Sequence, residues 1–151
     1  MRERTPVGED LTDLILEVFR LNGELLDAGN RIAKPHGLTS ARWQVMGAID
    51  LADQPLTVAQ IARRMGLARQ GVQRIVNDLK ELRMVELQDN LDHKRAPLVS
   101  ISEKGGKAMT SIDKSQVAWV NDLSKGLSER QVRQALKVLR SVLERSEQIK
   151  K

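Results

Sequence analysis

Residues 69–77 carry side chains that suit the edges of nucleic-acid bases. Two arginines, two glutamines and an asparagine recur at helical spacing, and they are Arg69, Gln70, Gln73, Arg74 and Asn77. Arginine can donate two parallel hydrogen bonds to guanine, and glutamine or asparagine can pair with adenine at two points. No aspartate or glutamate occurs from Gln54 to Asn77, so no carboxylate in this stretch repels phosphate groups. The pattern predicts a helix that enters the major groove of DNA.

A second basic group follows at His93, Lys94 and Arg95. It lies in a polar stretch between two short segments of apolar and alternating residues, 85–88 and 98–101. Such a pattern predicts two strands joined as a hairpin with a basic tip. Directly after a DNA-reading helix, this tip is expected to contact phosphates or the adjacent minor groove.

Residues 58–77 have the pattern of a helix-turn-helix, which holds the first basic group in place. Thr57 and Gln60 form a capping box that starts the first helix. Ala62 is small where the two helices approach, and Gly66 suits the left-handed turn between them. Apolar residues fall at the offsets that fill the wedge between the helices: Ile61, Met65, Leu67, Val72 and Ile75.

Further helices are predicted on both sides of this unit from apolar residues at three- and four-residue spacing. The first begins after a cap at Asp10 and ends at Pro35 and Gly37. The second runs from Thr39 through Leu51 and buries some of its large apolar side chains, which are Trp43, Met46, Ile49 and Leu51. A fifth helix is capped by Ser102 and ends at Gly126, and a capping box of Ser128 and Gln131 starts a sixth. The predicted fold is mainly α, with four helices, a small β-hairpin and two further helices.

The composition limits the function classes. The chain has 151 residues, a net charge of +5 and no cysteine, which excludes disulfides and thiolate ligands. Its only histidines, His36 and His93, are far apart in the sequence, so no metal site is expected. No nucleophile and base, phosphate loop or paired carboxylates stand in a recognisable setting, so neither an enzyme nor a cofactor is expected. No apolar run suits a membrane span or a signal peptide, and a cytoplasmic location is expected.

The chain resembles the multiple-antibiotic-resistance regulator (MarR) family of bacterial transcription factors. The resemblance rests on the helix order, on TVAQIARRMGLARQGVQRIVNDLKELRMVE and on DHKRAPLVSISEKG. It implies a winged helix-turn-helix lobe over residues 37–102. It also implies that residues 1–36 and 103–151 form a helical dimerisation region, with one intertwined domain overall. Two recognition helices of a homodimer would enter successive major grooves of a pseudo-palindromic operator.

The resemblance also implies a small anionic or phenolic effector that lowers DNA affinity. Arg42, Trp43 and Met46 fall near the region where the family places such a ligand. The chain departs from the family pattern at several positions. His93 stands where an acidic residue usually precedes the basic pair of the wing, with Asp92 one position earlier. Ala68 replaces the usual serine before the recognition helix, Arg83 stands near the usual glycine after it, and Leu87 replaces a frequent basic residue.

The sequence therefore predicts a DNA-binding transcriptional regulator, acting as a homodimeric repressor that a small-molecule effector releases. Two alternatives stay open. A winged helix can also serve as a protein-interaction module, and the chain can bind DNA without sequence preference or effector.

Overall fold

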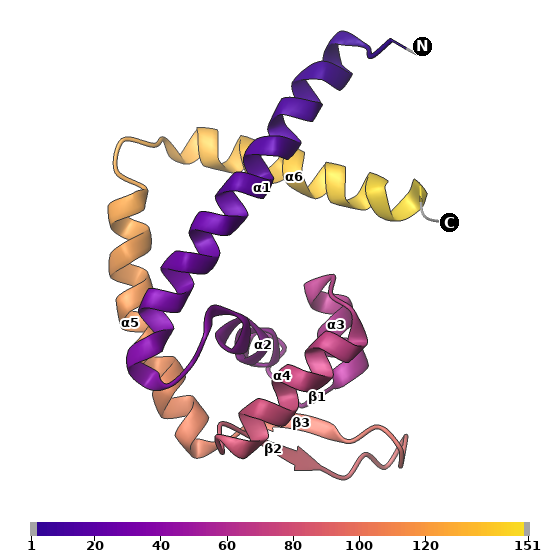
Figure 1. Cartoon of the computed structure of the whole chain (residues 1–151), viewed down its shortest axis with the longest axis vertical. Helices are drawn as coiled ribbons and strands as arrows, with labels where there is room; N and C mark the ends of the chain where they lie inside the picture. The colour runs from indigo at the N-terminus through magenta and orange to yellow at the C-terminus, as the bar shows by residue number, and fades with distance from the viewer. Residues whose placement is uncertain (1–2, 150–151) are drawn as a thin grey trace. The chain divides into compact units, whose positions relative to one another are not determined.

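The computed structural model describes residues 3–149. The chain divides into two compact units, one up to Ser115 and one from Gln116 onward. Figure 1 traces the elements of both units. The helices and strands are α1 (Pro6–Ala33), a short 3₁₀ helix (Lys34–His36), α2 (Ser40–Asp50), β1 (Leu56–Thr57), α3 (Val58–Met65), α4 (Arg69–Glu81), β2 (Val85–Gln88), β3 (Leu98–Ile101), α5 (Glu103–Leu123) and α6 (Glu129–Ile149).

Helix α1 begins earlier than the sequence predicts. Thr5 is its N-cap and accepts a hydrogen bond from the backbone N–H of Gly8, and Pro6 is the first helical residue. The prediction of a cap at Asp10 is therefore wrong. Proline at the first helical position loses no hydrogen bond and has its φ already set, so the helix extends back to it. The predicted end is confirmed, because the chain leaves the helix through Pro35 and a left-handed Gly37.

Helices α2, α3 and α4 pack around one hydrophobic core within the first unit. The largest fully buried side chains include Met46, Ile61 and Leu79. Leu67, which was predicted to fill the wedge between the helices, is not buried, and Leu51 is not among the side chains that the second helix buries. Leu51, in the turn after α2, is 87% exposed, and Leu67, in the turn between α3 and α4, is 50% exposed. Both residues lie just beyond the ends of their helices, where the helical spacing no longer determines which way a side chain faces.

The hairpin of β2 and β3 forms as predicted, and it is joined by a third strand that the sequence did not reveal. The antiparallel sheet has the order β1-β3-β2. Leu56 of β1 pairs with Val99 of β3, which in turn pairs with Leu87 of β2. Val99 is fully buried, so the central strand anchors the wing to the helical core.

Helix α5 starts at a close contact within the first unit, the winged unit that extends to Ser115. The Ser102 hydroxyl accepts a hydrogen bond from the N–H of Gly105 at 3.0 Å, which confirms the predicted cap. Gly105 lies so close to the Met84 carbonyl that a Cβ at this position would collide with it. The helix ends before Gly126, whose φ is 84°, as predicted.

Helix α6 differs from the other long helices because none of its described residues is buried. Its first turn is held by the predicted capping box, in which the Gln131 N–H donates to the Ser128 hydroxyl at 3.2 Å. Within residues 3–149, no helix combines the length and apolar character that crossing a membrane requires.

Candidate DNA-binding interface

The five predicted base-reading side chains lie on one exposed face of α4. The opposite face is buried through Val72, Val76 and Leu79, which fixes the rotation of the helix about its axis. On the exposed face the Gln73 amide donates a hydrogen bond to the Asn77 side-chain oxygen at 3.0 Å. Two polar groups one helical turn apart are thus already oriented with respect to one another. The exposed residues of this face are Arg69, Gln70, Gln73, Arg74 and Asn77.

The turn before α4 leaves the first backbone N–H groups of the helix without a side-chain cap. Gly66 adopts a left-handed φ of 65°, as predicted, and the Leu67 N–H returns to the Ala62 carbonyl at 3.0 Å. The N-cap residue, Ala68, has no side-chain acceptor. The uncapped N–H groups and the helix dipole together make this end electropositive. An anion placed there would be stabilised.

The C-terminal end of α4 is tied to α5. Arg83 has a left-handed φ of 59°, a conformation in which glycine is less strained. Its carbonyl accepts a hydrogen bond from the Ser102 hydroxyl at 2.7 Å, and the Lys104 ammonium donates to the Leu82 carbonyl at 2.8 Å. The carbonyls of Leu82 and Arg83, which directly follow the helix, are therefore satisfied from outside it. These contacts hold Arg83 in its unusual conformation.

The wing tip is braced by Asn90. Its side-chain amide donates to the Ala96 carbonyl at 2.8 Å, and its side-chain oxygen accepts from the Asp92 N–H at 3.1 Å. Asn90 therefore links the two arms of the loop across its base. The ion pairs among residues 3–149 do not include Asp92, so it does not hold a wing arginine in this structure. Sequence reasoning missed Asn90, although asparagine in a tight loop commonly bonds to the backbone two residues on.

A cleft of about 810 Å³ lies between the wing and the start of α3. It brings Arg69, His93 and Arg95 together, three of the predicted site residues. Arg63 of α3 lines it as well and was not among the predicted site residues. The absence of acidic residues around Arg63 was the sequence signal that pointed to it. Gln70, Gln73, Arg74, Asn77 and Lys94 are not part of this cleft and lie on the outer surface.

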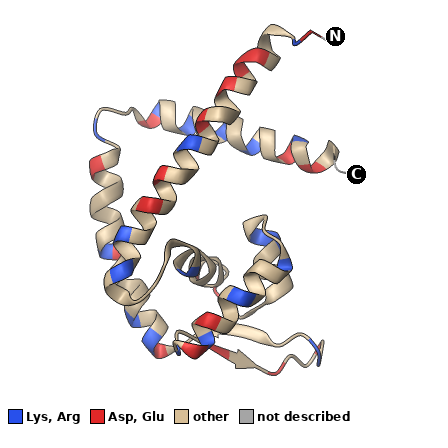
Figure 2. Cartoon of the chain, in the orientation of Figure 1, with Lys and Arg blue, Asp and Glu red and all other residues tan. Residues whose placement is uncertain are grey.

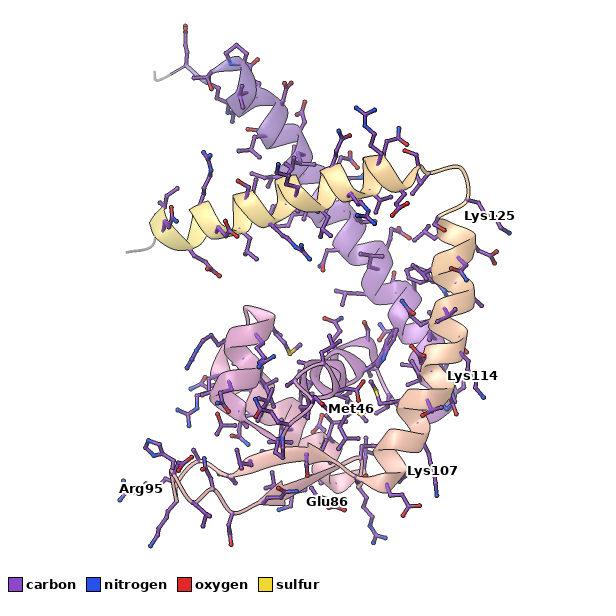
Figure 3. All side chains as sticks on the ribbon, turned by 180° about the vertical axis from the view of Figure 1, so that it is seen from behind. Met46, Glu86, Arg95, Lys107, Lys114 and Lys125 are labelled. Carbon is purple, nitrogen blue, oxygen red and sulfur yellow. The ribbon has the colours of Figure 1, made fainter. Side chains whose placement is uncertain are left out.

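The charge distribution separates this surface from α1. Figure 2 shows lysine and arginine on α3, on α4 and at the wing tip, and several acidic residues along α1. In Figure 3, Arg95 projects at the far end of the hairpin, away from the packed helices. Within the first unit, lysine and arginine therefore cluster on the helix-turn-helix and the wing tip, with further lysines at the start of α5.

The three predicted effector residues lie in different settings. The Arg42 guanidinium is ion-paired with Asp78 of α4 at 3.0 Å. Trp43 is half-buried against the core, and Met46 is fully buried among the helices (Figure 3). Arg42 and Trp43 thus retain surface that a ligand can reach, whereas Met46 does not. Residues 3–149 contain no cluster of histidine, aspartate and glutamate that would hold a metal ion.

Comparison with known proteins agrees with this geometry. Residues 36–96 match the model of the MarR family. An uncharacterized protein of Mycobacterium tuberculosis is 37% identical over 118 residues, which are 78% of this chain and 81% of that protein. The chain belongs to the MarR family, and its fold is the winged-helix fold of transcription regulators.

Two solved structures illustrate the fold. A mutant of MarR from E. coli, crystallised with operator DNA, has a TM-score of 0.79 and 19% identity, covering 92% of this chain and 99% of that one. CouR from Rhodococcus jostii, crystallised with p-coumaroyl-CoA, has a TM-score of 0.77 and 22% identity, covering 86% and 91% of the two chains.

Proposed function

We propose that this chain is a transcription regulator that binds specific sequences in duplex DNA as a homodimer. The observation that carries the proposal is the exposed face of α4, where arginine, glutamine and asparagine side chains stand in a stretch without carboxylates. Such a face provides both the positive charge that attracts phosphates and the paired donors that distinguish bases. Membership of the MarR family supports the same function.

In the proposed complex, α4 lies in the major groove and the wing follows the backbone. Gln70, Gln73 and Arg74 contact base edges, with Asn77 one turn further along the helix. Arg69 and the basic residues of the wing tip contact phosphates or the minor groove. The uncapped start of α4 adds backbone N–H groups that suit a phosphate. The E. coli protein of the same fold, crystallised with operator DNA, supports the binding of duplex DNA.

The homodimer is the second part of the proposal. Residues 1–36 and 103–151 form the dimerisation region, residues 37–102 form the DNA-binding lobe, and the whole is one intertwined domain. Exposed apolar side chains recur along the three helices of the dimerisation region and need a partner surface. A two-fold symmetric dimer would require a pseudo-palindromic operator. The exposed apolar residues of these helices include Leu14, Ile15, Val18, Phe19 and Leu25 of α1, Val117, Val120 and Leu123 of α5, and Val132, Leu136, Leu139 and Leu143 of α6.

The regulator acts as a repressor, and a small anionic or phenolic effector releases it from DNA. CouR, a relative in fold, is known with p-coumaroyl-CoA bound, which supports an effector of this kind. Arg42 and Trp43 present the charge and the aromatic surface for it, with Met46 in the core beneath. Binding would favour one of two pre-existing arrangements of the dimer, since a ligand shifts only equilibria to which it binds differently.

The experiment that tests the function is a selection of bound sequences from a random duplex library. Fluorescence anisotropy then compares the selected duplex with a shuffled duplex of the same composition over a range of salt. We expect a clear preference for the selected duplex and a steep loss of affinity with salt, since each neutralised phosphate releases counterions. Phenolic acids and their CoA thioesters are added afterwards, and a compound that binds without changing DNA affinity would contradict its role as effector.

One observation favours a second candidate function. Leu67, Leu87 and Leu91 are exposed on and around the helix-turn-helix and the wing, and exposed apolar side chains are typical of protein-interaction surfaces. A protein-interaction module would bind the selected and shuffled duplexes equally and weakly. The same assay therefore separates the two functions, and it separates specific from non-specific DNA binding.

A further inference from the structure

One ion pair joins two different helices of the winged unit. The Arg42 guanidinium of α2 donates to the Asp78 carboxylate of α4 at 3.0 Å, and the side chains are 29% and 49% exposed. The other ion pairs among residues 3–149 join positions three or four apart along the chain. Among residues 3–149, Arg42 and Asp78 therefore form the ion pair that links two different helices, in addition to the apolar core that packs them together.

The turn of α2 that carries Arg42 is itself locked onto α1. The Ser40 N–H donates to the Asn30 side-chain oxygen of α1 at 2.8 Å. A Cβ on Gly29 would collide with the Ser40 hydroxyl, so α1 and α2 approach closely at this point. The Gln44 amide completes the turn with a hydrogen bond of 3.0 Å to the same hydroxyl. The first turn of α2 thus contacts α1 on one side and α4 on the other.

We propose that Arg42 is a positioning residue for DNA reading, and that the first turn of α2 is a bracket that fixes α4 relative to α1. The inference rests on the proposed function, in which α1 belongs to the dimer interface and α4 enters the major groove. In a dimer, the distance between the two α4 helices has to match the spacing of two half-sites. Polar contacts join the first turn of α2 to α1 on one side and to α4 on the other. The position of α1 in the dimer interface therefore determines the position of the recognition helix.

The position of Asp78 allows three possible roles of the ion pair to be distinguished by mutation. Asp78 directly follows Asn77 and is the first carboxylate after the acid-free stretch. If Asp78 only repelled phosphates, removing its charge would strengthen binding to every duplex. If Arg42 only contacted DNA, its loss would weaken binding whether or not Asp78 were present. A bracket predicts a third result, in which loss of either partner lowers the preference for the specific duplex over the shuffled one.

The test is a double-mutant cycle on the full chain with Arg42→Gln, Asp78→Asn and the double variant. The quantity measured is the ratio of Kd for the shuffled duplex to Kd for the selected duplex. We expect each single variant to lower this ratio by about tenfold, and the double variant to lower it no further. On the shuffled duplex, by contrast, Arg42→Gln weakens binding and Asp78→Asn strengthens it, following the change in charge.

Matched controls exclude simple loss of folding or charge. Glu103→Gln and Lys107→Gln remove the same charges from an exposed ion pair of α5 and should leave the ratio unchanged. Arg42→Lys keeps the ion pair and should retain most of the preference, while thermal unfolding and light scattering check that each variant is folded and dimeric. An unchanged or raised ratio for Asp78→Asn, or additive losses in the double variant, would overturn the bracket. A wild-type chain that shows no preference would overturn the proposed function itself, and the bracket with it.

Discussion

The winged unit and helix α6 are built from similar fractions of apolar residues but use them differently. Up to Ser115, apolar side chains close around a core in which Val45, Ile61 and Val99 are fully buried. Along α6, apolar residues recur at three- and four-residue spacing, yet none of them is buried. The first region thus has a core of its own, although α1 leaves apolar side chains exposed, whereas α6 has only an exposed apolar stripe, which the proposed dimer would cover.

The largest expected effect comes from placing a charge in that stripe. Leu136→Asp should convert the proposed dimer to monomer, because a carboxylate in an apolar interface is costly to desolvate. Affinity for the selected duplex should fall about 100-fold or more, since each half-site is then bound independently. Light scattering and anisotropy measure the two effects.

The matched control is Leu51→Asp. Leu51 is among the most exposed leucines of the winged unit and lies outside the proposed dimerisation region. The same substitution there should leave the oligomeric state unchanged. If Leu136→Asp remained dimeric, the exposed apolar stripe of α6 would not be the dimer interface.

The next largest effect, on DNA affinity, is expected from a substitution on the exposed face of α4. Arg74→Ala should cost about 1–3 kcal/mol of binding free energy on the selected duplex if Arg74 makes a two-point contact with a base. On the shuffled duplex the loss should be smaller. Lys80→Ala, at the C-terminal end of the same helix, is the control of equal charge. Equal losses on both duplexes would show that Arg74 contacts only phosphates.

Two neighbouring glycines at the start of α5 test how closely this helix packs on the rest of the winged unit. Gly105→Ala should lower the free energy of unfolding by about 1–3 kcal/mol, because the added Cβ meets the Met84 carbonyl, Ile101 and Met46. Gly106→Ala, which meets no atom within 4 Å, should raise it by up to about 1 kcal/mol. Urea unfolding measures both. Equal effects would mean that α5 does not pack on the winged unit as described.

The smallest effect is expected in the wing. Asn90→Ala removes two hydrogen bonds across the base of the loop and should weaken DNA binding by about 0.5–1.5 kcal/mol. Faster amide exchange at the wing tip should accompany this loss. Gln88→Ala removes a side-chain contact to Ser100 outside the loop and should leave exchange at the tip unchanged. Weaker binding with unchanged exchange would assign Asn90 to direct DNA contact instead.

Much of this architecture was predictable because local chemistry determines it. The capping box at Thr57, the left-handed Gly66 and the hairpin between 85 and 101 each depend on residues close in sequence. The exposed face of α4 followed from helical periodicity, which predicted its orientation. The family resemblance was correct, and the comparisons confirm it.

The parts that sequence reasoning missed depend on distant contacts or on competition between signals. Strand β1 has two residues and exists only through its pairing with β3, so no local pattern predicts it. Asp10 is a good cap by type, but Pro6 starts the helix a turn earlier. The Arg42–Asp78 pair joins residues from two helices, and neither residue type alone indicates a partner.

The pairing of β1 with β3 has a consequence for how the protein is made. Leu56 is placed beside Val99 only after α3, α4 and β2 have all been synthesised. Contacts between distant residues require loop closure and slow folding. On the ribosome, the helix-turn-helix therefore emerges before the sheet that holds its wing can close. Since β3 is followed at once by α5, the strand that closes the sheet also leads directly into α5.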